Sequence, residues 1–143
     1  MDYSYIIIPI IATFSSQALK LVTDGVKGNF DLKNMLGAYG GFPSSHTAFA
    51  VSLTTLIGLR LGFDQPLFGA ALVFTLIVMR DAATFRRVLG QQSKLLNQMI
   101  TAMPNFKNFP KFQERLGHSG FEVLGGAVYG VAITYLLNLV LAS

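Results

Sequence analysis

Four long apolar segments, separated by polar stretches, set the pattern of this chain. They cover residues 3–22, 45–63, 66–85 and 120–141. Each is close to the roughly 20 apolar residues that a helix needs to cross a bilayer. Between residues 87 and 103, apolar side chains recur with a helical period among polar ones, which indicates an amphipathic helix. The pattern predicts an all-α membrane helical bundle of about four spans. The amphipathic helix between spans three and four is expected to lie along the membrane interface or to pack over the bundle.

The composition agrees with a membrane location. Of 143 residues, 52% are hydrophobic and only 13% are charged, too few charges to cover a soluble domain of this size. The first segment lacks the basic start and small-residue cleavage site of a signal peptide, so we treat it as a span. The chain has no cysteine, which excludes disulfides and thiolate metal sites. We expect one integral, multi-pass domain over residues 1–143, in a bacterial cell membrane or an organellar membrane.

The charged residues gather on one side of the predicted bundle. With four spans, the loops after spans one and three face the same side, and they hold every basic residue except Arg60. Such a bias ordinarily marks the cytoplasmic face. Basic residues that bind an anionic substrate would give the same distribution, so the side stays open. Arg80 and Asp81 fall at the membrane boundary, where an ionisable pair either serves function or simply ends the helix.

Both histidines lie at the predicted starts of spans on this basic side. His46 follows Pro43-Ser44-Ser45, a sequence typical of a turn that ends in a helix N-cap. A helix N-terminus offers unpaired N–H groups to an anion, and the serine hydroxyls are further donors. The alternative is a capped helix start with an incidental histidine.

His118 and Glu122 are four residues apart, so on a helix they share a face. A carboxylate that accepts a hydrogen bond from one ring nitrogen raises the basicity of the other, which is the logic of nucleophilic catalysis by histidine. The alternative is an ordinary interfacial pair. A second histidine and several cations on the same face favour a catalytic site.

These segments resemble the motifs of the type 2 phosphatidic acid phosphatase superfamily, which also includes bacterial acid phosphatases and vanadium haloperoxidases. In its first motif a lysine is followed, after six residues, by arginine and proline. Lys20 and Lys27 have this spacing, but lysine replaces arginine and Gly28 replaces proline. Its second motif, Pro-Ser-Gly-His, resembles residues 43–46 with Ser45 for glycine.

The third motif, Ser-Arg, five residues, His, three residues, Asp, is matched only at its end, by His118 and Glu122. The deviations are similar to those of a divergent branch of the superfamily, and the similarity runs in order along nearly the whole chain. It rests on Pro-Ser-Ser-His, Met79–Ala83 with Arg86, Gly90-x-Gln92, Leu95–Asn97 and Leu116–His118.

The resemblance implies a two-step phosphoryl transfer that needs neither metal nor cofactor. His118 is the implied nucleophile, which forms a phosphohistidine and is oriented by Glu122. His46 is the implied acid for the leaving oxygen and base for the attacking water. The implied phosphate-binding residues and their support are Lys20, Lys27, Ser44, Ser45, Arg86 and Asp81. A site at the bilayer boundary suggests a lipid phosphate or diphosphate, of phosphatidyl or polyprenyl type.

Two other functions remain open at this point. One is a catalytically inactive scaffold or transporter-like protein that keeps the fold. The other is a metal site of His46, His118, Asp81 and Glu122, which the clustered cations disfavour because they repel a metal ion. Besides the lipid substrate we expect membrane lipids as partners and no nucleic acid. Gly126 and Gly130 form a small-xxx-small pair, which predicts a homodimer through that face.

Overall fold

A computed structural model describes residues 3–23, 41–103, 109–114 and 116–141. Its helices are α1 (Ser4–Thr23), α3 (Ser45–Leu61), α4 (Pro66–Ala83), α5 (Phe85–Ala102) and α6 (Gly120–Leu141). The all-α prediction is confirmed, and every predicted boundary lies within two residues of the observed one. The helix ends follow local chemistry, since Ser44 caps α3 and Pro66 occupies the first turn of α4.

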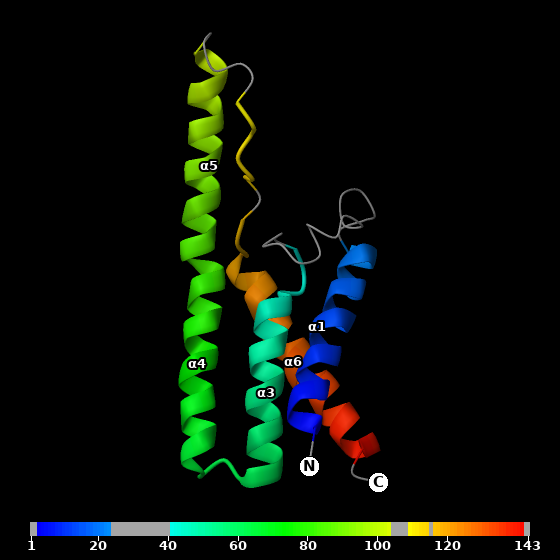
Figure 1. The fold of residues 1–143 in the computed structure, drawn as a ribbon. Coiled ribbons are helices and arrows are strands. Elements are labelled where there is room, and N and C mark those ends of the chain that lie inside the picture. Colours follow the sequence, from blue (N-terminus) through cyan, green and yellow to red (C-terminus); the bar gives the residue numbers. More distant parts are fainter. Residues whose placement is uncertain (1–2, 24–40, 104–108, 115, 142–143) are drawn as a thin grey trace.

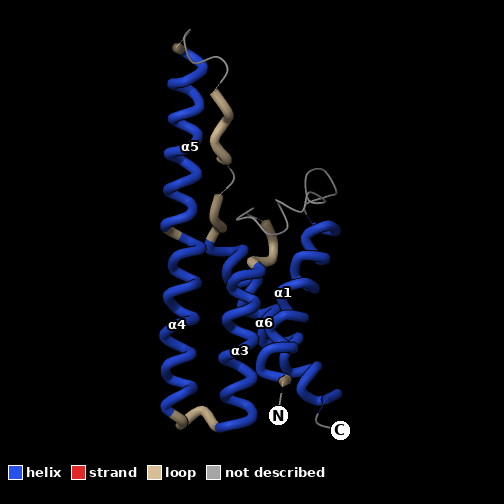
Figure 2. Tube along the Cα trace, viewed as in Figure 1, coloured by secondary structure: helices blue, strands red, loops and turns tan. Residues whose placement is uncertain are grey.

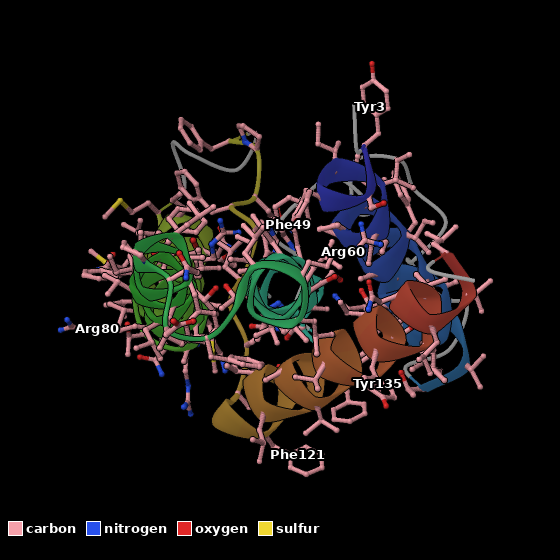
Figure 3. All side chains as sticks on the ribbon, turned by 90° about the horizontal axis from the view of Figure 1, so that it is seen from below. Tyr3, Phe49, Arg60, Arg80, Phe121 and Tyr135 are labelled. Atoms are coloured by element: carbon pink, nitrogen blue, oxygen red, sulfur yellow. The ribbon has the colours of Figure 1, made fainter. Side chains whose placement is uncertain are left out.

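Helices α1, α3, α4 and α6 run alternately up and down, so both chain termini lie at the same end of the bundle (Figure 1). Helix α3 packs against each of the other three. Viewed along the bundle, α3 occupies the centre with α4 on one side and α1 and α6 on the other (Figure 3). We call the end that carries the termini the terminal end, and the opposite end the site end.

The interior around α3 is built from small and hydroxyl-bearing side chains. The hydroxyls of Thr54 and Thr75 lie 2.8 Å apart, and that of Thr75 also donates to Ala50 O. The Thr134 hydroxyl of α6 contacts the Ser52 hydroxyl at 2.6 Å. In an apolar environment, such bonds between helices satisfy polar groups that water cannot reach. They tie α4 and α6 to the central helix.

Large apolar side chains cover the outside of the bundle. On α4, only Thr75 and Ala82 are buried, and the other helices also expose large aliphatic and aromatic groups, among them Ile6, Phe14, Ile77, Leu124, Val128 and Leu136. A surface of this kind suits lipid rather than water. The α4–α5 rod (Pro66–Ala102) and α6 are long and apolar enough to cross a membrane. Four crossings stay a prediction.

Helix α5 departs from its expected position. It continues the line of α4 beyond the site end of the bundle, with a short break at Thr84 (Figures 1 and 2). Thr84 has helical backbone angles and the junction contains no proline, so nothing turns the chain toward the interface or over the bundle. The segment before α6 runs back beside α5, because the Asn97 amide bonds both backbone groups of Phe112 and the carboxylate of Glu114.

The predicted small-residue face of α6 packs within the chain. A Cβ on Gly126 would lie 2.4 Å from Ser44 O, and one on Gly130 would lie 2.8 Å from Ala48 O. The absence of a side chain at these positions therefore lets α6 approach the backbone of α3. A homodimer through this face stays a prediction, and it would have to form without the contact to α3.

At the terminal end, the side chain of Arg60 contacts two neighbouring helices. Arg60, near the C-terminus of α3, donates from Nε to the Asn138 side chain of α6 at 2.7 Å. Its guanidinium also lies 5.8 Å from the ring centre of Tyr5 on α1. One side chain thus links three helices at this end.

Candidate active site

At the site end, the N-termini of α3 and α6 meet. The Ser44 N–H donates to Glu122 O at 3.0 Å, next to the close approach at Gly126. The Phe42 ring stacks on Phe121 with centroids 5.1 Å apart, and it covers Gly125, where a Cβ would collide with it. Two positive helix ends are therefore held side by side, an arrangement that favours an anion.

The N-terminus of α3 is capped by one serine and leaves the next one unpaired. The Ser44 hydroxyl accepts from the backbone N–H of Thr47 at 3.4 Å and lies 3.1 Å from its hydroxyl. The Ser45 Oγ is buried and has no hydrogen-bond partner among the described residues. A buried hydroxyl without a partner is rare, and its position at a helix N-terminus suits a ligand oxygen.

The two histidines lie close together, with ring centroids 6.4 Å apart. His118 is only 3% exposed, and its backbone N–H donates to Ala82 O of α4 at 2.9 Å. Gly117 makes this position possible. It has a φ of +81°, and a Cβ there would lie 2.4 Å from the backbone nitrogen of Arg87. The loop before α6 is thus fixed against the junction of α4 and α5.

Glu122 stands beside His118 because it caps α6. The Ser119 N–H donates to Glu122 Oε2 at 2.8 Å, and the Glu122 N–H donates to the Ser119 hydroxyl at 3.2 Å. This reciprocal pair is a capping box. The same Oε2 lies 3.3 Å from His118 Nδ1, close enough for an ion pair but without hydrogen-bond geometry. A small rotation of either side chain would complete the bond.

Burial and the nearby Lys20 ammonium lower the pKa of His118 to about 4, whereas Glu122 acts in the opposite direction. The imidazole is therefore neutral at physiological pH, which is the state that a nucleophilic or basic nitrogen requires. Lys20 itself is only 4% exposed, near the C-terminus of α1.

Charged side chains surround His46. Arg86, Lys20 and Asp81 are the groups that act on it electrostatically. Arg86 is held by Asp81, with Nε 3.0 Å from Oδ2, as expected for an acidic partner of a cation. Lys27, the second lysine of the first motif, lies outside the described residues. The structure thus brings Lys20, His46, Ser45, Arg86 and His118 to one end of the bundle.

The geometry does not support the metal-site alternative. Within the described part of the chain, no three histidine, aspartate or glutamate side chains group closely enough to hold a metal ion. His46, His118, Asp81 and Glu122 therefore do not form a ligand set of the kind considered from the sequence.

Sequence reasoning gave no role to the residues that position the site, although Gly90, Asn97 and Gly117 lie in the motifs that carry the resemblance. Gly90 allows the segment before α6 to run beside α5, since a Cβ there would lie 2.5 Å from Glu114 O. The same is true of Gly117, Asn97 and Ser119, which fix the position of the backbone and do not take part in the chemistry. The spacing of Ser119 and Glu122 was the one local signal available, because it matches a capping box.

Residues 1–133 match the Divergent PAP2 family, and the chain belongs to that family. The resemblance seen in the motifs is confirmed at this level. The chain is also 33% identical over 117 residues to the uncharacterized membrane protein YuiD of Bacillus subtilis (strain 168), across 73% of this chain and 74% of YuiD. No solved structure matches it. With its apolar exterior, the chain is a PAP2-like membrane protein.

Proposed function

We propose that this protein is a multi-pass membrane phosphatase that hydrolyses a lipid phosphate or diphosphate through a phosphohistidine. The observation that carries the proposal is a neutral, buried His118 beside Glu122, facing a second histidine at the junction of two helix N-termini. Membership of the Divergent PAP2 family supports it.

Substrate binding relies on positive charge and hydrogen-bond donors. The free N–H groups of α3, the Ser45 hydroxyl, Lys20 and Arg86 are the groups that take the phosphate oxygens. Asp81 keeps the Arg86 guanidinium in place. Phosphoryl transfer depends chiefly on positioning and charge stabilisation, so a cluster of cations and N–H groups supplies most of what the reaction needs.

In the first step, Nε2 of His118 attacks phosphorus while Nδ1 keeps its proton and turns to Glu122. The bond between phosphorus and the leaving oxygen breaks, and His46 gives that oxygen a proton. In the second step, His46 takes a proton from water as the water attacks the phosphohistidine. The bond from Nε2 to phosphorus breaks, orthophosphate leaves, and both histidines return to their starting states.

The position of the site supports a lipid substrate. If all four predicted spans cross the bilayer, His46 and His118 lie at one membrane boundary, where the phosphate of a lipid lies. The basic residues on this side favour the cytoplasmic face by the ordinary charge rule. The substrate classes that fit are phosphatidyl and polyprenyl phosphates or diphosphates.

The test is phosphate release by the purified protein in detergent, in the presence of chelator, across a panel of phosphatidyl and polyprenyl substrates. We expect turnover that is lost in His118→Ala and strongly reduced in His46→Ala, because the second variant lacks both the acid of the first step and the base of the second. Arg60→Met, at the terminal end, is the matched control and should keep activity. Absence of turnover on every substrate would favour the inactive scaffold, and dependence on added metal would contradict the phosphohistidine route.

A further inference from the structure

A lateral groove of about 390 Å³ lies beside His46, between α1, α3 and α4. Ser45 and His46 line one part of it, and Ile10, Phe14, Phe49 and Phe74 line the rest. Phe14, Phe49 and Phe74 are 59%, 40% and 55% exposed, so the groove opens sideways, toward the surface that faces lipid.

The groove has a polar end and an apolar end. Along α1 its lining runs from Gln17, on the side of the site, to Ile10, about 10 Å away at the rise of an α-helix. None of the residues that line it is charged apart from the titratable His46. The cations Lys20 and Arg86 act on His46 at the polar end. Its volume lies within the range of small-molecule sites.

We propose that this groove holds the hydrocarbon tail of the substrate and that the lipid enters sideways from the bilayer between α1 and α4. The proposal rests on the proposed function and names the part of the protein that recognises the apolar half of the substrate. One molecule with an anionic head and an apolar tail matches both ends of the groove, because Ser45 and His46 belong to the groove and to the phosphate site.

The physical role of the groove is orientation. A lipid tail is already out of water in the membrane, so moving it into the groove gains little hydrophobic free energy. A fixed first stretch of tail, however, aligns the phosphate with His118 and removes rotational freedom before the reaction. Beyond Ile10 the tail continues into the bilayer, so the groove selects the part of the tail next to the head.

A photoreactive probe tests the groove without turnover. The probe is a long-chain alkyl phosphonate with a diazirine near its head, which the protein cannot hydrolyse because it has a carbon–phosphorus bond. After irradiation in detergent and peptide mapping, we expect adducts at Phe14, Phe49 and Phe74. Equal labelling of outward positions on α6, such as Val128, would overturn the proposal.

Neighbouring residues on α4 provide a matched pair of variants. Val78 lines the groove, whereas Ile77 is 61% exposed and does not line it. Val78→Trp places an indole in the groove and should reduce labelling about tenfold, which corresponds to a loss of about 1.4 kcal/mol of probe binding. Ile77→Trp adds the same bulk outside and should leave labelling unchanged. Equal labelling of the two variants would contradict the proposal.

A second probe separates the substrate tail from any bilayer chain. The same diazirine tail with an alcohol in place of the phosphonate should label the groove more weakly, because it has no charge for the site to hold. Equal labelling would show that the groove takes lipid tails regardless of the head and would overturn its link to the site. Labelling in a protein that hydrolyses no lipid phosphate would retain the groove and reject the phosphatase. Turnover without groove labelling would retain the phosphatase and reject the groove as the binding site of the tail.

Discussion

The two ends of the bundle treat their polar groups in opposite ways. At the terminal end, Arg60 is paired with Asn138 and lies over Tyr5, so the cation serves as a link between helices. At the site end, Ser45 Oγ and His118 Nδ1 are buried without hydrogen-bond partners among the described residues. A polar group that is satisfied within the protein stabilises the fold, and one that is left unsatisfied is available to a ligand.

This difference has an energetic side. A buried polar atom without a partner costs about 1–3 kcal/mol, so the site end needs packing contacts in addition to its hydrogen bonds. The packing of α6 on α3 through Gly126 and Gly130 provides that support. Substitutions at the site end should therefore change activity more than stability, and substitutions at the terminal end should do the opposite.

Among residues without a direct chemical role, the largest effect is expected for Gly117→Ala. Alanine at this position must keep a positive φ, and its Cβ must move the backbone of Arg86 and Arg87. Both effects displace His118. A displacement of about 1 Å reduces catalysis on the order of 100-fold. The measurement is kcat/KM with a lipid phosphate. Gly120→Ala is the control, because a Cβ at Gly120 meets nothing within 4 Å. Equal activity of the two variants would mean that Gly117 does not position the site.

A smaller effect is expected for Arg86→Lys. Lysine keeps the charge but loses the planar contact with Asp81, so the cation is less well placed at the phosphate. We expect about a tenfold loss of kcat/KM. Asp81→Asn should give a similar loss, and the double variant should lose little more than either one. Additive losses would show that the two residues act separately.

The pH dependence follows from the low pKa of His118. A folded pKa of about 4, against 6.5 for an ordinary histidine, keeps the imidazole neutral until the pH falls near 4. Between these two values the unfolded chain binds more protons than the folded one, so stability falls as the pH drops through this window. The rate of phosphoenzyme formation should therefore fall at low pH, and the midpoint of this acid limb should lie near pH 4.

Removing the charge of Lys20 should move this limb. Because Lys20 lowers the pKa of His118, Lys20→Met should shift the acid limb of phosphoenzyme formation to higher pH. Ionisation of the substrate phosphate is common to both proteins, so the displacement between their profiles is the quantity to measure. A limb at the same pH in the two proteins would argue against His118 as the titrating group.

The smallest effect on activity is expected for Arg60→Met. The variant loses the bond to Asn138, which should reduce the free energy of unfolding in detergent by about 1–2 kcal/mol. Phosphate release should stay unchanged, since Arg60 lies at the end of the bundle opposite the site. A large loss of activity with normal stability would contradict the assignment of stability to the terminal end and of activity to the site end.

Much of the fold could be predicted from the sequence because hydrophobic length and helix signals are local. The bounds of α6 were predicted correctly, and the gathering of both histidines at one end followed from the alternation of spans. The orientation of α5 could not be predicted. Its periodicity identifies an apolar face but does not say which segment covers it, and Asn97 finds its partners at Phe112 and Glu114, far along the chain.

The residues of the candidate site could be named from the sequence, but their geometry could not. The motifs identified His46, His118, Glu122 and Arg86, whose side chains carry recognisable chemical roles. The dependence on Gly117 was not visible, because it arises from the approach of two backbones that the sequence does not bring together. Glu122 was assigned a role in orienting histidine, and the structure adds that it caps α6 through Ser119.

The contact between α3 and α6 also has a consequence for biogenesis. Helices α1, α3 and α4 emerge from the ribosome before His118 and Glu122, which arrive with α6. Until α6 inserts, Ser44 and Ser45 have no second helix end beside them, and the loop that rests on Ala82 does not exist. Assembly of the helix bundle and assembly of the proposed site are therefore a single event, and a nascent chain halted before α6 lacks both His118 and Glu122.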